Sequence, residues 1–349
     1  MDMKEALTRL TTAPGVTGNE CAGAADVAEE YFRRYTDDVW RGTAGNVYAR
    51  MGSGKPVILF AAHMDEVGMI VEDIEENGML RIRSVAGVDP RVLPGSEVLV
   101  YGRETLPGVV GAIPPHLLGN TDKNAAYKLT DLCCDIGYPP EKVKELVAVG
   151  DFVTFAPFPP VEVKNGRMAG KTFDDRALVT AMIEAMDILS KRKFDCTVVF
   201  CATVQEERTG FGSKSGTFEI DPDMGIAVDV CHAPTPGTEP LDTVDMDKIA
   251  VTRGSNLHPK MVERIISVCD DMNIPYDIDV CMAHTGTDAW EMQIERGGVP
   301  TGLFSLPLRY MHTNVECIDM ETLKNCARVM AGFVCSIGAD WEETLCSID

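Results

Sequence analysis

Residues 57–65 read Val-Ile-Leu-Phe-Ala-Ala-His-Met-Asp, an unbroken apolar run that ends in a histidine and an aspartate. Six consecutive apolar residues of this length and composition predict a buried strand. In open α/β sheets, ligands bind in the crevice beyond the carboxyl ends of the strands. We therefore expect His63, which closes the run, to lie where such a site would form.

Four further candidate metal ligands stand at comparable boundaries between apolar runs and polar segments. They are Asp174 before a helix, Glu207 after the run 198–204, Asp229 at the end of the run 226–228, and His312 after the run 306–311. Two histidines and three carboxylates gathered at one sheet edge would suit a pair of hydrolytic divalent ions.

Composition limits the class of protein. The chain has 349 residues, above the size at which single cores stop growing, so two domains are expected. The net charge of −22 disfavours nucleic acid and anionic membrane surfaces as partners. No signal peptide and no membrane-spanning run is recognised. The 12 cysteines include no CxxC pair and favour a reduced cytoplasmic protein over a secreted disulfide framework.

The pattern of apolar and polar residues changes near residue 68. Short alternating stretches such as 80–85 and 97–101 are separated by Gly, Pro and Asn, which predicts a small β-barrel or sandwich. Longer helices and strands return after residue 162. We predict an α/β catalytic domain formed by residues 1–67 and 163–349, with a mixed sheet between helices, interrupted by a β-rich insertion at 68–162. Its expected helices are 18–34, 175–192, 288–296 and 319–337, and its expected strands include 57–62, 197–204, 225–230 and 299–306.

Each candidate ligand has an ordinary structural explanation when taken alone. Asp65 lies two residues after His63 on the same side of a strand, so it could accept from the second ring nitrogen. A core histidine held by a carboxylate gives the same pattern. Asp174 and Asp175 could simply cap a helix, as could Asp288. Glu206 and Glu207 could form a solvated acidic turn, and Asp229 competes with His232 as a ligand.

Charge balance favours the metal interpretation once the residues are considered together. Three carboxylates and one hydroxide carry four negative charges, which two divalent ions neutralise, so the cluster can sit in a partly dry cleft. Glu206 is then left over as a general base that takes a proton from water and returns it to the leaving amine.

Seven segments, in this order, carry a family resemblance. They are Thr-Ala-Pro-Gly-Val-Thr-Gly (12–18), Ala-His-Met-Asp-Glu-Val-Gly (62–68), Gly-Lys-Thr-Phe-Asp-Asp-Arg (170–176), Val-Gln-Glu-Glu (204–207), Asp-Val-Cys-His-Ala (229–233), Gly-Thr-Asp-Ala (286–289) and Leu-Arg-Tyr-Met-His-Thr (308–313). The chain resembles the dinuclear metallo-aminopeptidases of family forty-two, the glutamyl aminopeptidase and tetrahedral (TET) group, over nearly its whole length.

The resemblance implies a role for each candidate residue. Asp174 would bridge two ions, zinc or cobalt, with His63 and Asp229 on one ion and Glu207 and His312 on the other. Glu206 would be the general base and Asp65 would orient His63. It further implies removal of amino-terminal residues from peptides, a PDZ-like dimerisation insertion, and homo-oligomers that extend from dimers to tetrahedral dodecamers.

One stretch departs from the family, and other functions stay open. Residues 208–212 read Arg-Thr-Gly-Phe-Gly where the family usually has Val-Gly-Leu-Arg-Gly, which affects the expected substrate preference and the geometry of Glu206. A deacylase or carboxypeptidase would use the same ions with Arg176 or Arg309 on a substrate carboxylate. A glycosidase using Glu206 or Glu207 and a non-catalytic assembly component are further alternatives.

Overall fold

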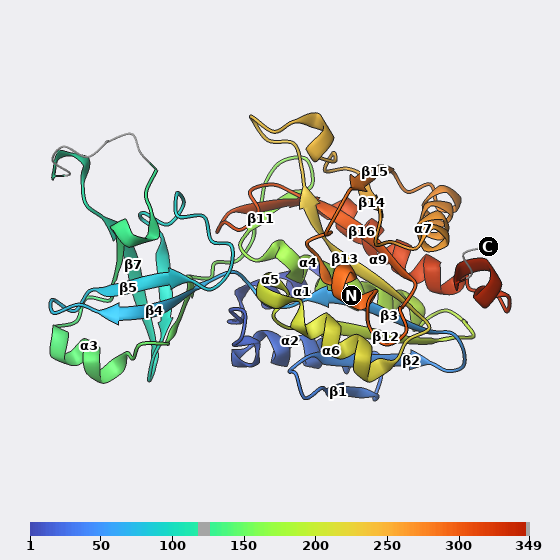
Figure 1. Cartoon of the computed structure of the whole chain (residues 1–349), viewed down its shortest axis with the longest axis horizontal. Helices are drawn as coiled ribbons and strands as arrows, with labels where there is room; N and C mark the ends of the chain where they lie inside the picture. Colours follow the sequence, from blue (N-terminus) through green and yellow to red (C-terminus); the bar gives the residue numbers. More distant parts are fainter. Residues whose placement is uncertain (118–125, 347–349) are drawn as a thin grey trace.

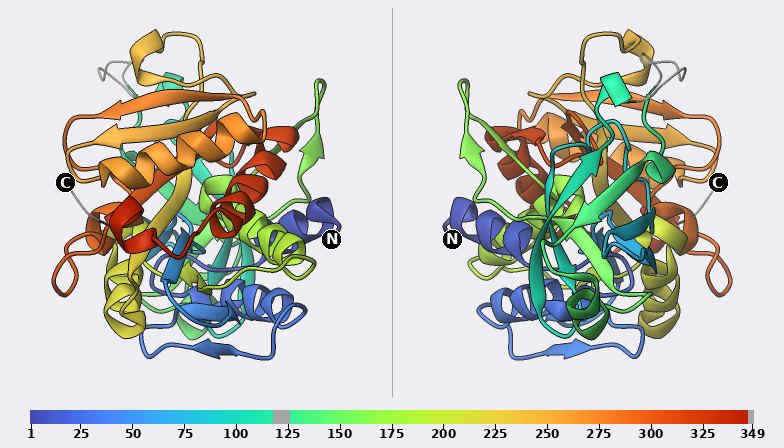
Figure 2. Two further views of the ribbon diagram at one scale, coloured as in Figure 1. Left: turned by 90° about the vertical axis from the view of Figure 1, so that its right-hand side faces the viewer. Right: turned by 90° about the vertical axis from the view of Figure 1, so that its left-hand side faces the viewer.

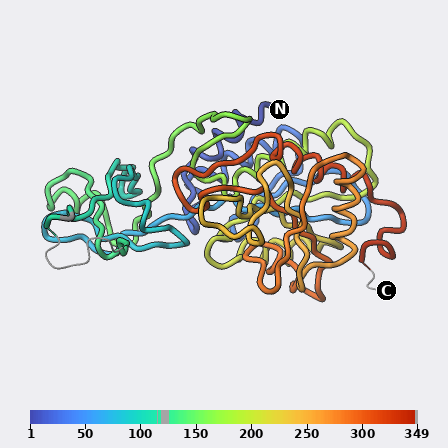
Figure 3. Tube along the Cα trace, turned by 90° about the horizontal axis from the view of Figure 1, so that it is seen from above, coloured from blue at the N-terminus to red at the C-terminus, as the bar shows by residue number. Residues whose placement is uncertain are grey.

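The computed structural model describes residues 1–117 and 126–346. It has two parts, an α/β part built on an eight-stranded sheet and a closed six-stranded barrel beside it (Figure 1). The chain passes between them twice, entering the barrel in the blue-to-cyan segment and leaving it in the green segment (Figure 3). The prediction of an α/β fold with an inserted β-barrel is confirmed.

The large sheet is mixed, as predicted. Its order is β1-β2-β12-β3-β13-β16-β14-β15. The strands are β1 (Val39–Arg41), β2 (Val47–Gly52), β3 (Val57–His63), β12 (Thr197–Thr203), β13 (Met224–His232), β16 (Thr301–Leu308), β14 (Ile249–Gly254) and β15 (Tyr276–Cys281). The central strands β12, β3, β13 and β16 are parallel to one another, so their carboxyl ends meet at one edge.

Helices cover both faces of this sheet. On one face α4 (Phe173–Leu189) and α9 (Met320–Cys335) pack together, with α1 (Met3–Thr12), α2 (Ala24–Phe32) and α7 (Pro259–Asp271) beside them. On the other face α6 (Phe211–Ile220) contacts α8 (Asp288–Met292). The apolar stripe expected along residues 178–189 is buried in α4. Helix α1, in dark blue, and the helical turn at 342–346, in dark red, lie on opposite sides of the α/β part (Figure 2).

The barrel closes in the order β4-β5-β8-β7-β6-β9. Its strands are β4 (Met69–Ile74), β5 (Leu80–Ser84), β6 (Glu97–Tyr101), β7 (Thr105–Ala112), β8 (Leu132–Asp135) and β9 (Phe152–Phe155), and helix α3 (Pro140–Leu146) lies between β8 and β9 in the sequence. The predicted insertion also includes residues 118–125, which lie outside the described residues. A small sheet follows, in which β11 (Arg167–Gly170) lies between β10 (Val161–Glu162) and β17 (Glu316–Asp319).

Two predicted helices are shorter in the structure. The segment 18–34 divides into a 3₁₀ turn at Glu20–Ala22 and helix α2, because Gly23 packs against the ring of Pro14 where a side chain would collide. The helix expected at 288–296 ends at Met292. Periodicity alone did not reveal either boundary.

Candidate metal centre

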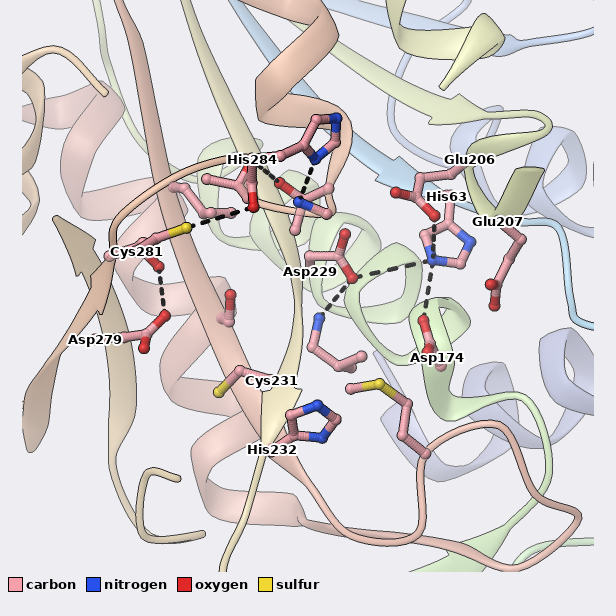
Figure 4. A pocket seen from close by; sticks show the side chains of 18 of the residues that line it. His63, Asp174, Glu206, Glu207, Asp229, Cys231, His232, Asp279, Cys281 and His284 are labelled. Carbon is pink, nitrogen blue, oxygen red and sulfur yellow. Dashed lines mark hydrogen bonds and ion pairs between the residues drawn. The ribbon is translucent and has the colours of Figure 1, made fainter. Parts of the chain in front are cut away.

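Five elements bring the candidate ligands to the carboxyl edge of the sheet. His63 is the last residue of β3, and Asp229 lies in the adjacent strand β13. Glu207 lies in the short helix α5 (Glu206–Thr209) that follows β12, Asp174 lies in the first turn of α4, and His312 lies in the loop after β16. Figure 4 shows the labelled side chains of His63, Asp174, Glu206, Glu207 and Asp229 pointing toward one another.

The ligand atoms form two groups that share one carboxylate. His63, Asp174 and Asp229 form the first group, and Asp174, Glu207 and His312 form the second, with the atoms of each group within 4.8 Å of one another. Asp174 Oδ1 lies 3.0 Å from His63 Nε2, and Asp174 Oδ2 lies 3.3 Å from His312 Nε2. One oxygen of Asp174 therefore faces each group.

The distances within the groups are those expected of ligands around one ion. Two ligands about 2.1 Å from the same zinc at a tetrahedral angle lie roughly 3.4 Å apart. His312 Nε2 lies 3.2 Å from Glu207 Oε2, and His63 Nε2 lies 4.0 Å from Asp229 Oδ1. In addition, Glu207 Oε1 is buried without a hydrogen-bond partner among the described residues. The donor set fits two divalent cations.

Both histidines present the same ring nitrogen to the cluster. His63 Nδ1 lies 3.2 Å from the backbone oxygen of Asp65, and His312 Nδ1 lies 3.0 Å from the backbone oxygen of Gly87. A proton on Nδ1 can be donated to each carbonyl, which leaves Nε2 as an electron-pair donor. Gly87 belongs to the loop after β5, so the barrel part contributes directly to the environment of His312.

The directions of the pKa shifts at the cluster indicate that its buried carboxylates need positive charge nearby. Burial raises the pKa of Asp229 well above its ordinary value, and burial followed by repulsion from Asp174 raises the pKa of Glu207. Burial alone would lower the pKa of His312, but the carboxylates of Asp174 and Glu207 outweigh it and raise that pKa to about 11. Protons thus take up the charge that divalent ions would supply.

Glu206 lies beside the first group. Its Oε2 is 3.9 Å from His63 Nε2, and its side chain is 13% exposed. Burial raises the pKa of Glu206 well above its ordinary value, which His63 partly offsets. A carboxyl group of raised pKa beside the ligand cluster suits proton transfer near neutral pH.

Asp65 contacts more than the sequence suggested. Its Oδ1 lies 3.5 Å from His63 Nδ1, but its carboxylate also accepts from the backbone N–H groups of Glu206, at 3.0 Å, and Glu207, at 3.2 Å. One buried carboxylate therefore supports both a histidine and the acidic turn.

Glu316 is a functional residue that the sequence analysis missed. Its Oε2 accepts from the backbone N–H groups of Phe173 (2.6 Å) and Asp174 (3.1 Å), and its Oε1 accepts from that of His312 (3.0 Å). This carboxylate ties together the two segments that form the second group. The only sequence signal was a glutamate four residues after His312.

The capping interpretation of three aspartates is wrong. Thr172 precedes α4, and neither Asp174 nor Asp175 caps it, because the Asp174 oxygens face His63 and His312 and Asp175 accepts from the backbone N–H of His63. The cap of α8 is Thr287, whose side chain accepts from Ala289 N. Asp288 instead points inward and accepts from Thr203 Oγ1 at 2.6 Å.

Two details of β13 bear on the choice between Asp229 and His232 as a ligand: where the strand ends and where the His232 side chain lies. The strand expected at 225–230 continues to His232. The side chain of His232 is exposed, and His232 belongs to neither ligand group in the described chain.

A cavity of about 920 Å³ opens over the centre. The ligands line one part of it, and residues of β14, β15 and the loop 284–287 line the rest. His284 accepts from Gly286 N and its ring lies 4.3 Å from that of Trp290, so the loop is held by its own contacts.

Arg176, one of two arginines considered for binding a substrate carboxylate, cannot do so. It is fully buried, and its guanidinium donates to the backbone oxygens of Met64, Leu10, Ala13 and Gly15. Arg309 does not line the cavity. Neither of the two arginines considered for the deacylase and carboxypeptidase alternative is therefore placed to bind a substrate carboxylate, whereas Arg208 does line the cavity.

The histidines and carboxylates at the carboxyl edge of the sheet form the kind of donor set that metal-dependent hydrolases use. The chain belongs to the M42 glutamyl aminopeptidase family, whose model matches residues 45–329. The prediction of a metal-dependent aminopeptidase is confirmed by this match.

Individual relatives cover nearly the whole chain. A lysyl aminopeptidase of Pyrococcus furiosus is 33% identical over 327 residues, 92% of this chain and 93% of the relative. The TET aminopeptidase structure of a marine sediment thaumarchaeon superposes with a TM-score of 0.92, at 28% identity over 98% of both chains. The TET1 peptidase of Pyrococcus horikoshii, described as assembling into a tetrahedron or a large octahedral shell, gives 0.84 at 29% identity, covering 96% of this chain and 100% of that one.

Proposed function

We propose that this enzyme removes amino-terminal residues from peptides with two divalent ions held by His63, Asp174, Glu207, Asp229 and His312. The observation that carries the proposal is the Asp174 carboxylate, whose two oxygens face two separate groups of ligand atoms. A carboxylate shared in this way is how co-catalytic sites place two ions side by side.

The chain's own residues account for the proton transfers. When bound, the two ions would polarise the scissile carbonyl and make a water molecule more acidic. Glu206, beside His63, takes the proton of the attacking water and delivers it to the leaving amine. Asp65 holds the backbone of Glu206, so the base stays in place during both transfers. Glu316 likewise holds the backbone of Asp174 and of His312 in place by accepting from their N–H groups.

The metal is proposed to be zinc or cobalt, because two imidazoles and three carboxylates are ligands that these ions accept. The chain is further proposed to act as a cytoplasmic homo-oligomer. All 12 cysteines are free thiols, which suits a reducing compartment. The relative described as assembling into a tetrahedron or a large octahedral shell supports oligomerisation, and the barrel part is the proposed dimerisation surface. Among the described residues, no helix has the length and apolar character required to cross a bilayer.

The decisive experiment compares free and N-acetylated aminoacyl substrates on protein stripped of metal and then reloaded with zinc, cobalt or manganese. We expect no turnover of the stripped protein, restored turnover of the free substrate, and two equivalents bound by calorimetric titration. Equal turnover of the acetylated substrate would contradict the exopeptidase proposal. Full activity after chelation would contradict the use of metal ions and would revive the glycosidase alternative.

A further inference from the structure

The cavity extends from the ligands to the outer edge of the sheet. Asp229 on β13 pairs with Ser305 on β16, which pairs with Ala250 on β14. Thr252, two residues after Ala250, pairs with Asp279 on the edge strand β15. Paired residues, and residues two apart along a strand, share one face of a sheet. Asp229 and Asp279 therefore lie on the same face, separated by three strand spacings (about 14 Å) across the sheet and two residues (about 7 Å) along it, or about 16 Å in all.

The outer end of the cavity holds a carboxylate without a cationic partner. Asp279 is partly exposed, and its Oδ2 accepts from Thr252 Oγ1 at 3.2 Å. Among residues 1–117 and 126–346, no lysine, arginine or histidine forms an ion pair with it. By contrast, Asp277 on the same strand lies 2.8 Å from Lys248 Nζ. Asp279 is therefore available to a ligand, whereas Asp277 is already neutralised.

The cavity wall around Asp279 is also negatively charged. A second carboxylate, Asp242, also lines the cavity, and Cys231 lies between the two ends of it. Of the described lysines and arginines, Arg208 is the one that lines the cavity, and it follows Glu207 on the side of the ligands. Figure 4 shows Asp279 on the far side of the cavity from Glu207. A cation that enters the outer end therefore meets carboxylates, while an anion is repelled.

The length of the substrate's side chain decides whether its end can reach Asp279. An extended lysine or arginine carries its charge about 6–7 Å from Cα, and a hydrogen bond adds about 3 Å more. Together with the few ångströms between a substrate Cα and the ions, this spans most of the separation between Asp229 and Asp279. The side chains of leucine and glutamate cover roughly half of that reach or less.

We propose that Asp279 selects peptides whose amino-terminal residue is lysine or arginine, by accepting a hydrogen bond from the side-chain cation. This inference rests on the proposed aminopeptidase function and specifies its substrate class. A charge-assisted hydrogen bond of this kind supports a preference of about 10- to 100-fold in kcat/KM over an uncharged side chain.

The test measures kcat/KM of the metal-loaded protein for Lys-, Arg-, Leu- and Glu-p-nitroanilides. Wild-type protein is expected to prefer Lys and Arg. Asp279→Asn should lower the ratio of kcat/KM for Lys over Leu by about 10- to 100-fold, mainly through KM, and Asp279→Glu should retain part of the preference. Asp277→Asn, the matched control on the same strand, should leave that ratio unchanged.

Other outcomes would overturn the inference in distinguishable ways. A wild-type preference for Leu or Glu would overturn the substrate class while leaving the aminopeptidase intact. A preference for Lys that survives Asp279→Asn unchanged would remove Asp279 from its assigned role. Failure to cleave all four substrates, with each metal, would overturn the proposed function and this inference with it.

Discussion

The two parts of the molecule are folded by different chemistry. The barrel core consists of apolar side chains such as Val71, Leu80 and Val153, and the buried polar residues described between 69 and 155 are Ser96 and Thr154. The α/β part has a larger apolar core, yet it also buries many charged groups. They are Glu66, Lys171, Arg176, His63, Asp65, Asp174, Asp175, Asp229, Asp288 and Glu316. Charge is thus buried where chemistry is expected and absent where only a rigid shape is required.

The buried charged groups of the α/β part explain how the site is kept in place. Glu66 lies where the chain leaves the sheet for the barrel and contacts Lys171, Thr172 and Arg176, which lie where the chain has returned. Burial would raise the pKa of Glu66, but the cations of Lys171 and Arg176 outweigh it and lower the pKa. The charged cluster holds both crossings beside Asp174 without using any barrel residue except Thr154.

The largest contrast should appear in catalysis. Glu206→Gln removes the proposed base and should lower kcat by about 10²- to 10⁴-fold while both ions stay bound. Glu97→Gln on the exposed face of barrel strand β6 makes the same chemical change and should leave kcat within twofold of wild type. Steady-state kinetics with calorimetric metal titration measures both. Undiminished turnover of Glu206→Gln would exclude Glu206 as the base.

The next contrast concerns stability. Arg176→Met removes a buried guanidinium that donates to four backbone carbonyls and to Glu66, so we expect a loss of about 3–5 kcal/mol in the free energy of unfolding. Arg83→Met on barrel strand β5 removes an exposed arginine that pairs with Glu72 and should change it by less than about 0.5 kcal/mol. Urea denaturation compares the two. Similar losses would refute the idea that buried charge distinguishes the parts.

A third substitution tests the one described place where the barrel reaches a ligand. A Cβ at Gly87 would lie 2.5 Å from His312 Nδ1, so Gly87→Ala should displace the ring and break its hydrogen bond. We expect about 10- to 100-fold weaker binding of one ion and unchanged binding of the other. Gly111→Ala in β7, where the nearest atom is 3.9 Å away, is the control. Two unaltered binding isotherms for Gly87→Ala would show that the barrel contact is dispensable.

The smallest effect should come from charge on the outside of the α/β part. Hydrogen bonds from Arg9, followed by those from Arg34, lower the pKa of Glu30 to about 2, yet its side chain is 49% exposed. Solvent screening limits the contribution to about 1 kcal/mol or less. Because the folded pKa lies below the ordinary 4.5, this stabilisation is complete above pH 4.5 and is lost as the pH falls toward 2.

Glu30→Gln should therefore destabilise slightly at pH 7, and its difference from wild type should shrink when unfolding is measured below pH 4.5. A difference that grows on acidification would contradict the sign of this linkage.

Much of the fold and site could be predicted because the signals were local. The apolar run before His63 predicted a central strand, and alternating stretches such as 97–101 predicted the barrel. The five candidate ligands named from the sequence are the five that the structure gathers into two groups. What could not be predicted depends on backbone groups. Glu316 and Gly87 act through N–H and C=O groups of distant segments, which leave no residue pattern.

The order of strands in the sheet has a consequence for how selectivity can change over evolution. The ligands stand on or beside β12, β3 and β13, each of which is paired on both sides, whereas β15 is paired only with β14. Substitutions or insertions in an outermost strand disturb fewer neighbours, and such a strand opens locally at a lower free energy. Substrate preference can therefore change among relatives through substitutions in this edge strand, while the metal ligands on the inner strands stay the same.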